Sequence, residues 1–208
     1  MLGLSTVHAS AGNTLMAAAP ASDTPLYSPA LVTNPDQSFG LIEVRVGGAL
    51  SNLELLPYLW FIPDLQSFSK SRTDSIQFDA LVNIDAPWLN LPWGEGKPRL
   101  SVGGMYNLGG YENLVHLGVD YQFALGDSPF YLEAGAGIGL HDGYVKDGPA
   151  GFHKLGCPVL AHWKAGIGWN VTDRVTATID WQHMSGFVFG CHPNQGLNHI
   201  GLVVGYKF

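Results

Sequence analysis

The sequence carries little charge and lacks any long apolar run. Only 13% of its 208 residues are Asp, Glu, Lys or Arg, about half the share that is usual in soluble domains. No run of about 18 or more uncharged, apolar residues is present, so no transmembrane helix is predicted. The ten Lys and Arg residues are scattered and the net charge is −7. We therefore expect no nucleic-acid partner, which would need clustered cations.

Apolar residues, aromatic residues and glycine are abundant instead. Nonpolar and aromatic types make up 46% of the chain, aromatic residues alone 12%, and there are 27 glycines. One domain with a full core is the default for this length. The low charge suggests that lipid rather than water covers much of the surface. Without an apolar helix, only a closed β-barrel can span a membrane.

Polar and apolar residues alternate with a period of two in eight segments, which is typical of strands with one apolar face. The predicted strands are residues 39–50, 75–85, 99–109, 113–125, 130–141, 159–170, 175–185 and 199–208. Each has roughly the ten residues that a tilted barrel strand needs. We therefore expect an all-β fold, an eight-stranded antiparallel transmembrane β-barrel over residues 39–208.

The connections between these strands favour a bacterial outer membrane. Short turns such as residues 126–129 and 171–174 are typical of the periplasmic side, and long loops face outward. The outer loops would then be residues 51–74, 109–112, 142–158 and 186–198. Cys157 and Cys191 fall in the third and fourth of them. This predicts a disulfide between neighbouring loops, with two free thiols as the alternative.

The two ends of the chain and the first outer loop carry further signals. Residues 1–38 contain Ala-x-Ala-like sites but no basic stretch, so we treat them as a lead-in that resembles the remnant of a signal peptide. Tyr206 and Phe208 lie two positions apart, so both rings should point outward at a membrane interface. Residues 53–63 are strongly apolar and either lie on the outer leaflet or lengthen the first two strands.

The strand predicted at residues 175–185 has one polar and one apolar face. The polar face, suited to the barrel interior, consists of Thr176, Thr178, Asp180 and Gln182. The apolar face consists of Val175, Ala177, Ile179 and Trp181, and it continues to His183 and Ser185. A polar pair on a lipid-facing strand is costly unless it lies near the headgroups or serves a function.

The spacing of His183 and Ser185 allows nucleophilic catalysis. Their Cα atoms should lie about 6–7 Å apart. Across that gap an imidazole can take the proton of a serine hydroxyl that attacks an acyl carbonyl. A bare His-x-Ser pair also fits an interface-anchoring histidine beside a serine at a strand end.

The residues that follow strengthen the catalytic interpretation. Asn194-Gln195-Gly196 comes nine residues after Ser185, and the last eight residues read Gly-Leu-Val-Val-Gly-Tyr-Lys-Phe. This order resembles the C-terminal signature of the lipid A 3-O-deacylase family, in which His-x-Ser-Asn leads to Asn-x-Gly and a closing Gly-Leu-x-x-Gly-Tyr-x-Phe strand. Residues 130–143 also resemble the fifth strand of that family and its His-Asn-Gly end. The resemblance covers roughly residues 99–208.

The resemblance implies a role for each polar residue of this segment. Ser185 would be the nucleophile, His183 its general base and Asn194 the donor to the oxyanion. The glutamate that orients the histidine in the family is matched by Asn198, after one inserted residue is allowed. Asparagine can orient an imidazole but cannot stabilise the imidazolium by charge, so we expect slow activity, with an inactive relative as the alternative. Gly186 is a second departure, because the family has asparagine after the serine.

Other polar residues are predicted near the outer rim. Those that could ligate a metal are His141, Asp142, His153, His192 and His199. Their spacings fit no metal motif, so we interpret them as rim residues and expect no metal. The cations of the outer loops are Lys70, Arg72, Lys146 and Lys154. They either pair with lipid A phosphates or are simply solvated.

Together these features predict an outer-membrane serine ester hydrolase. It would release an ester-linked acyl chain from the lipid A of lipopolysaccharide in the outer leaflet, through an acyl-enzyme and without a cofactor. The alternative is a non-catalytic outer-membrane barrel with a structural or interaction role, in which Ser185 is dispensable. A pore is not expected, because side chains fill the interior of an eight-stranded barrel.

Overall fold

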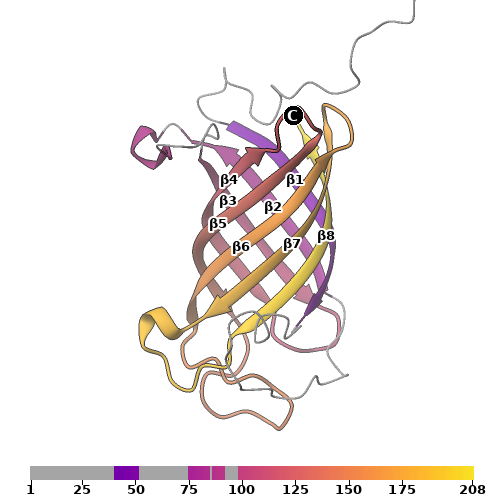
Figure 1. The fold of residues 1–208 in the computed structure, drawn as a ribbon. Helices are drawn as coiled ribbons and strands as arrows, with labels where there is room; N and C mark the ends of the chain where they lie inside the picture. Colours follow the sequence, from indigo (N-terminus) through magenta and orange to yellow (C-terminus); the bar gives the residue numbers. More distant parts are fainter. Residues whose placement is uncertain (1–39, 52–74, 85, 92–97) are drawn as a thin grey trace, which may run out of the picture.

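The computed structural model describes residues 40–51, 75–84, 86–91 and 98–208. The strands are β1 Gly40–Ser51, β2 Ser75–Asn83, β3 Arg99–Asn107, β4 Leu114–Ala124, β5 Phe130–His141, β6 Val159–Asn170, β7 Val175–Ser185 and β8 Leu197–Lys207. Consecutive strands pair in antiparallel fashion and β1 also pairs with β8, which closes the barrel. Figure 1 shows one wall of strongly tilted strands. The predicted eight-stranded barrel is confirmed.

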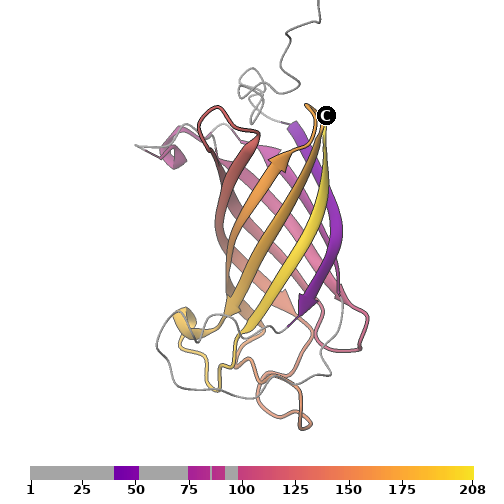
Figure 2. The ribbon, with the colours of Figure 1, turned by 45° about the vertical axis from the view of Figure 1, so that its right-hand side comes forward.

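Two short 3-10 helices lie outside this wall, η2 at Pro87–Leu89 and η3 at Phe187–Phe189. Each projects from one end of the barrel (Figure 1). Neither of these described helices is long and apolar enough to cross a membrane. We call the end of the barrel opposite the C-terminus the outer end; it carries η3 (Figure 2).

The predicted strand bounds are close to the observed ones. β5, β6 and β7 match residue for residue, and β1 and β4 differ by one residue at their ends. β3 stops at Asn107 rather than at residue 109. The side-chain Oδ1 of Asn107 accepts hydrogen bonds from the backbone N–H of Gly109 and of Tyr111, and these bonds turn the chain. β8 begins at Leu197, two residues before the prediction, so Asn198 belongs to a strand and not to the outer loop.

The predicted second strand was too long, since β2 ends at Asn83. The connection from β2 to β3 contains η2 and is longer than the tight turns at 126–129 and 171–174. Several predictions fall on residues outside the described ranges: the lead-in at 1–38, the apolar segment 53–63, and the cations Lys70 and Arg72.

Paired charges fill the middle of the barrel. Arg45 and Arg99 each contact both Glu43 and Glu133, with N–O distances of 2.7–3.2 Å. Lys164 lies 3.2–3.8 Å from four carboxylates, those of Asp79, Asp120, Glu133 and Asp180. All of these side chains are buried. A buried charge costs several kcal/mol unless it is paired, so this network holds opposite walls together and fills the space that a pore would need.

Apolar side chains occupy part of the outer end of the interior, beside buried polar residues such as Ser51 and Ser75. The apolar side chains form one cluster: Ala49, Met105, Leu114, Leu155, Leu160, Met184 and Leu197. Met184 stands between His183 and Ser185 in β7, and Gly139 on β5 leaves the room that its side chain fills. Burying a methionine side chain contributes roughly 1.5–3 kcal/mol. Met184 therefore fixes the inward face of β7, and its two neighbours must face outward.

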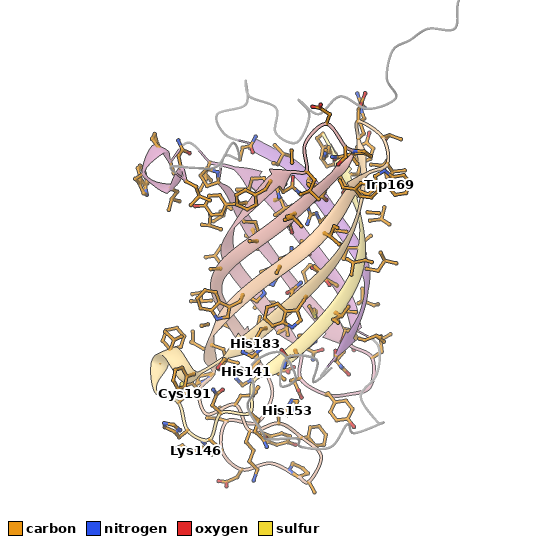
Figure 3. The ribbon with its side chains drawn as sticks, viewed as in Figure 1. His141, Lys146, His153, Trp169, His183 and Cys191 are labelled. Carbon is orange, nitrogen blue, oxygen red and sulfur yellow. A yellow bond between two sulfur atoms is a disulfide. The ribbon has the colours of Figure 1, made fainter. Side chains whose placement is uncertain are left out.

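The exterior of the wall is apolar and ends in aromatic residues near the C-terminus. Val46, Ile179 and Leu202 are each more than half exposed. Trp169, labelled in Figure 3, lies at this end, and the centroid of its ring is 6.4 Å from that of Phe130. Tyr206 and Phe208 are exposed and in edge contact, 5.2 Å between centroids. The outward direction predicted for both rings is confirmed.

Candidate active site

β7 presents His183 and Ser185 on the outer surface of the barrel. Side chains at even positions of this strand are buried in the interior, whereas both of these residues are partly exposed on the other face. Figure 3 shows His183 at the outer end, opposite the end that carries Trp169. This is the placement that the alternation predicted.

Asn198 lies directly across from His183 on β8. The two residues are register partners in the β7–β8 ladder. Nδ1 of His183 lies 2.9 Å from Oδ1 of Asn198. The same Oδ1 accepts a second hydrogen bond, of 3.3 Å, from Nε1 of Trp181. The rings of Trp181 and His183 are stacked, with centroids 5.7 Å apart and planes 15° from parallel.

Asn194 contacts Ser185 from the loop between η3 and β8. Its Nδ2 donates to Oγ of Ser185 at 2.8 Å. Its Oδ1 accepts from the backbone N–H of Gly186 at 3.0 Å, which holds the amide in place. The backbone N–H of Phe187 donates to the same Oγ at 3.2 Å. Two N–H donors therefore converge on the hydroxyl oxygen of Ser185.

The two halves of the site are adjacent but not yet joined. Among the described residues, no hydrogen bond connects His183 to Ser185, whose Oγ is engaged by Asn194 and Phe187. The free edge of the imidazole faces Gly196, where a methyl group would lie 3.2 Å from Cε1 and 3.9 Å from Nε2 of His183. Gly196 has a φ of +64°, a conformation that favours glycine.

Cys157 and Cys191 form a disulfide, with Cα atoms 5.6 Å apart, as the loop assignment predicted. It joins the outer loop after β5 to the loop that carries Asn194. Two further hydrogen bonds tie these loops, from Gln195 N to Lys154 O at 3.1 Å and from Lys154 N to Gln195 Oε1 at 2.7 Å. The loop that carries Asn194 is thus held by the neighbouring outer loop, the one between β5 and β6.

Cys191 also limits the space at Gly186, the position where the family that the sequence resembles has asparagine. A side chain at Gly186 would bring its Cβ within 2.6 Å of Cβ of Cys191, and Leu155 O lies 3.2 Å away. The backbone N–H of Cys191 donates to Gly186 O at 3.1 Å in the same place. A side chain such as asparagine at position 186 would therefore collide with Cys191 in this loop conformation.

Two of the histidines predicted at the rim, His141 and His153, have separate partners. His141 Nε2 lies 2.7 Å from Cys157 O, and His153 Nδ1 lies 3.1 Å from Glu112 Oε1. His199 lies near the outer end, where it is the register partner of Ser51, but its side chain is buried in the interior because odd positions of β8 face inward. His192 is exposed. Within the described part of the chain, no three His, Cys, Asp or Glu side chains are placed to hold a metal.

Three contributors to the site were missed by the sequence analysis. Trp181 was interpreted only as part of the apolar face, although it precedes His183 by two positions on that face. The backbone N–H of Phe187 and the space at Gly196 carried no sequence signal, because both depend on how the loop folds back onto β7.

The family model for lipid A 3-O-deacylase (PagL) matches residues 75–207. The chain belongs to this family. The matched range contains β7, β8 and the loop between them, and it leaves out β1. Membership of this family and the barrel fold together place the protein in the bacterial outer membrane.

Several solved structures are similar to this chain, and the first of them shows the same fold. The crystal structure of the outer membrane enzyme PagL is 16% identical, with a TM-score of 0.54, over 81% of this chain and 100% of that one. The N-terminal β-barrel domain of Pseudomonas aeruginosa OprF is 15% identical, with a TM-score of 0.46, over 81% and 99%. Neisserial surface protein A is 13% identical, with a TM-score of 0.43, over 83% and 98%. No curated protein matches the chain.

Proposed function

We propose that this protein is a serine ester hydrolase that removes an ester-linked acyl chain from the lipid A of lipopolysaccharide in the outer leaflet. Ser185 is the nucleophile, His183 the general base, Asn198 the residue that orients His183, and Asn194 the oxyanion donor. The observation that carries the proposal is the 2.8 Å hydrogen bond from Asn194 Nδ2 to Ser185 Oγ, beside a histidine held by Asn198.

The reaction begins when His183 takes the proton of Ser185 and Oγ attacks the ester carbonyl carbon. The carbonyl oxygen then carries negative charge. A carbonyl bound to Oγ lies close to the two donors that converge there, Asn194 Nδ2 and the Phe187 N–H. One such donor stabilises the transition state by about 3–4 kcal/mol. His183 returns its proton to the departing sugar oxygen, which leaves an acyl-enzyme on Ser185 and a free sugar hydroxyl.

Water completes the cycle. His183 takes a proton from the water molecule that attacks the acyl-enzyme, and then returns that proton to Ser185 Oγ as the fatty acid leaves. The first step requires the Ser185 hydroxyl to turn toward His183 when the ester is bound. Catalytic hydrogen bonds of this kind often form only in the substrate complex. No cofactor takes part in these steps.

The position of the site supports a lipid substrate. His183, Ser185 and Asn198 all lie on the outer surface of a wall whose other outward residues are apolar. On β6, Ala161 pairs with Ser185, and exposed Val159 continues the apolar surface two residues further toward the outer end. Ser185 is therefore reached from the apolar surface, where the acyl chains of an outer-leaflet lipid lie, and not from the barrel interior.

Mass spectrometry of lipid A tests the proposal directly. Outer membranes that contain the wild-type protein should lose one hydroxyacyl mass from lipid A, and membranes that contain Ser185→Ala should not. Ser128→Ala, which alters a half-buried serine in the turn before β5, at the end of the barrel away from His183, should behave like wild type. Unchanged lipid A in the presence of folded wild-type protein would overturn the proposal in favour of a non-catalytic barrel.

A further inference from the structure

Trp181 makes a hydrogen bond to the site that the roles of Ser185, His183 and Asn194 do not require. Its Nε1 lies 3.3 Å from Oδ1 of Asn198, the atom that also faces Nδ1 of His183 at 2.9 Å. Trp181 and His183 share one face of β7, and Asn198 faces them from β8. One amide oxygen is thus contacted by two ring nitrogens from the same strand.

The indole N–H fixes which end of the Asn198 amide faces the histidine. An asparagine side chain can present either its oxygen or its NH₂ group, and the two ends have nearly the same shape. The indole nitrogen is a donor only. If the amide were reversed, the NH₂ group would meet the Trp181 N–H donor to donor. The Trp181 hydrogen bond therefore selects the orientation in which Oδ1 faces both rings.

This orientation determines where His183 carries its proton. Oδ1 is an acceptor only, so Nδ1 of a neutral His183 must be the protonated nitrogen. Nε2 then carries the lone pair. That is the tautomer in which an imidazole acts as a general base through Nε2, the edge that faces away from Asn198.

We propose that Trp181 is a positioning residue, which fixes the amide of Asn198 and through it the tautomer of His183. Its catalytic consequence rests on the proposed function. A carboxylate at position 198 would present an acceptor whichever way it turned. The indole donor is needed here because the residue at this position is asparagine. The competing explanation is that Asn198 only satisfies an indole N–H on an apolar surface.

The variant Trp181→Phe separates these explanations, because phenylalanine keeps a ring beside His183 but removes the donor. The first measurement is ¹⁵N NMR of histidine-labelled protein in detergent, with the His183 signals assigned by their loss in His183→Gln. Wild type should show His183 protonated on Nδ1, and Trp181→Phe should show a mixture of tautomers. Trp163→Phe is the matched control, because Trp163 is the register partner of His183 on β6 and faces outward.

The second measurement is a double-mutant cycle on lipid A deacylation. Trp181→Phe should lower kcat about 5- to 10-fold, as loss of one orienting hydrogen bond does, with little change in KM. In an Asn198→Asp background the same change should leave kcat unaltered, since a carboxylate has no donor end. Equal losses in both backgrounds, or an unchanged tautomer in Trp181→Phe, would refute the inference. An inactive wild type would refute the proposed function, while the NMR result would still decide the role of Trp181.

Discussion

Asn194 and Ser185 are nine residues apart in the chain, and the amide of one donates to the hydroxyl oxygen of the other at 2.8 Å. The bond joins a loop to the end of a strand, and the second end of the same amide is held by the backbone of Gly186. The donor is therefore oriented before any substrate binds, which is the condition for strong stabilisation of an oxyanion.

The first prediction concerns this donor. Asn194→Ala should lower kcat about 10²- to 10³-fold, the usual effect of removing an oxyanion donor, with a small effect on KM. Asn194→Asp should be at least as damaging, because a carboxylate cannot donate and repels the oxyanion. Steady-state kinetics on purified lipid A measure both. Asn170→Ala, at the opposite end of the barrel wall, serves as control, and equal rates for all three variants would remove Asn194 from the mechanism.

The second prediction concerns Asn198, a neutral residue at the position where the family has a glutamate. Asn198→Glu should raise kcat about tenfold, or ~1.4 kcal/mol of barrier, because a carboxylate beside Nδ1 stabilises the imidazolium that forms when His183 takes the proton. Asn198→Leu keeps the approximate size but has no acceptor, so it should be nearly inactive. A slower Asn198→Glu enzyme would show that charge at this position does not limit the reaction.

The third prediction concerns the disulfide. Replacing Cys157 and Cys191 together by serine should lower deacylation strongly and leave the barrel folded, because the disulfide holds the loop of Asn194 but no strand of the wall. The cross-link spans 34 residues, which corresponds to roughly 4 kcal/mol of loop entropy in the chain-entropy estimate. Activity measured with and without a reductant tests the first part. The shift in electrophoretic mobility on heating reports whether the barrel is intact.

The fourth prediction concerns η3, which begins two residues after Ser185 and exposes three apolar side chains in a row. Phe187 is 78% exposed, Val188 62% and Phe189 50%. Changing both phenylalanines to serine should raise KM for lipid A in membranes and leave kcat unchanged, since the apolar contact with acyl chains is lost. Hydrolysis of a water-soluble short-chain ester should not respond. Trp88→Ser, at an equally exposed residue of η2, is the control at the other end.

Much of the fold could be predicted because each strand carries its own alternation of polar and apolar residues. β5, β6 and β7 were predicted in full, and each is bounded by a turn or loop with clear turn residues. The end of β3 could not be, because it depends on hydrogen bonds from the loop to the side chain of Asn107. The charge pairs of the interior were also beyond prediction, because they join strands far apart in the sequence.

The candidate site was predictable only in part for a similar reason. Alternation within one strand is enough to place His183 and Ser185 on the same outward face. It does not reveal that Asn198 faces His183, because that depends on the register between β7 and β8, and the alternation places Asn198 in an outer loop. The converging donors from Asn194 and Phe187 depend on a loop closed by a disulfide.

Paired charges fill the middle of the barrel, and the proposed site lies on the outward face of its wall. In the proposed reaction, protein and lipid would meet by lateral diffusion within the leaflet, and turnover would depend on the number of lipid A molecules per unit of membrane area rather than on their amount per volume. Added detergent or inert phospholipid would slow the reaction by spacing the substrate apart, even at constant total lipid A.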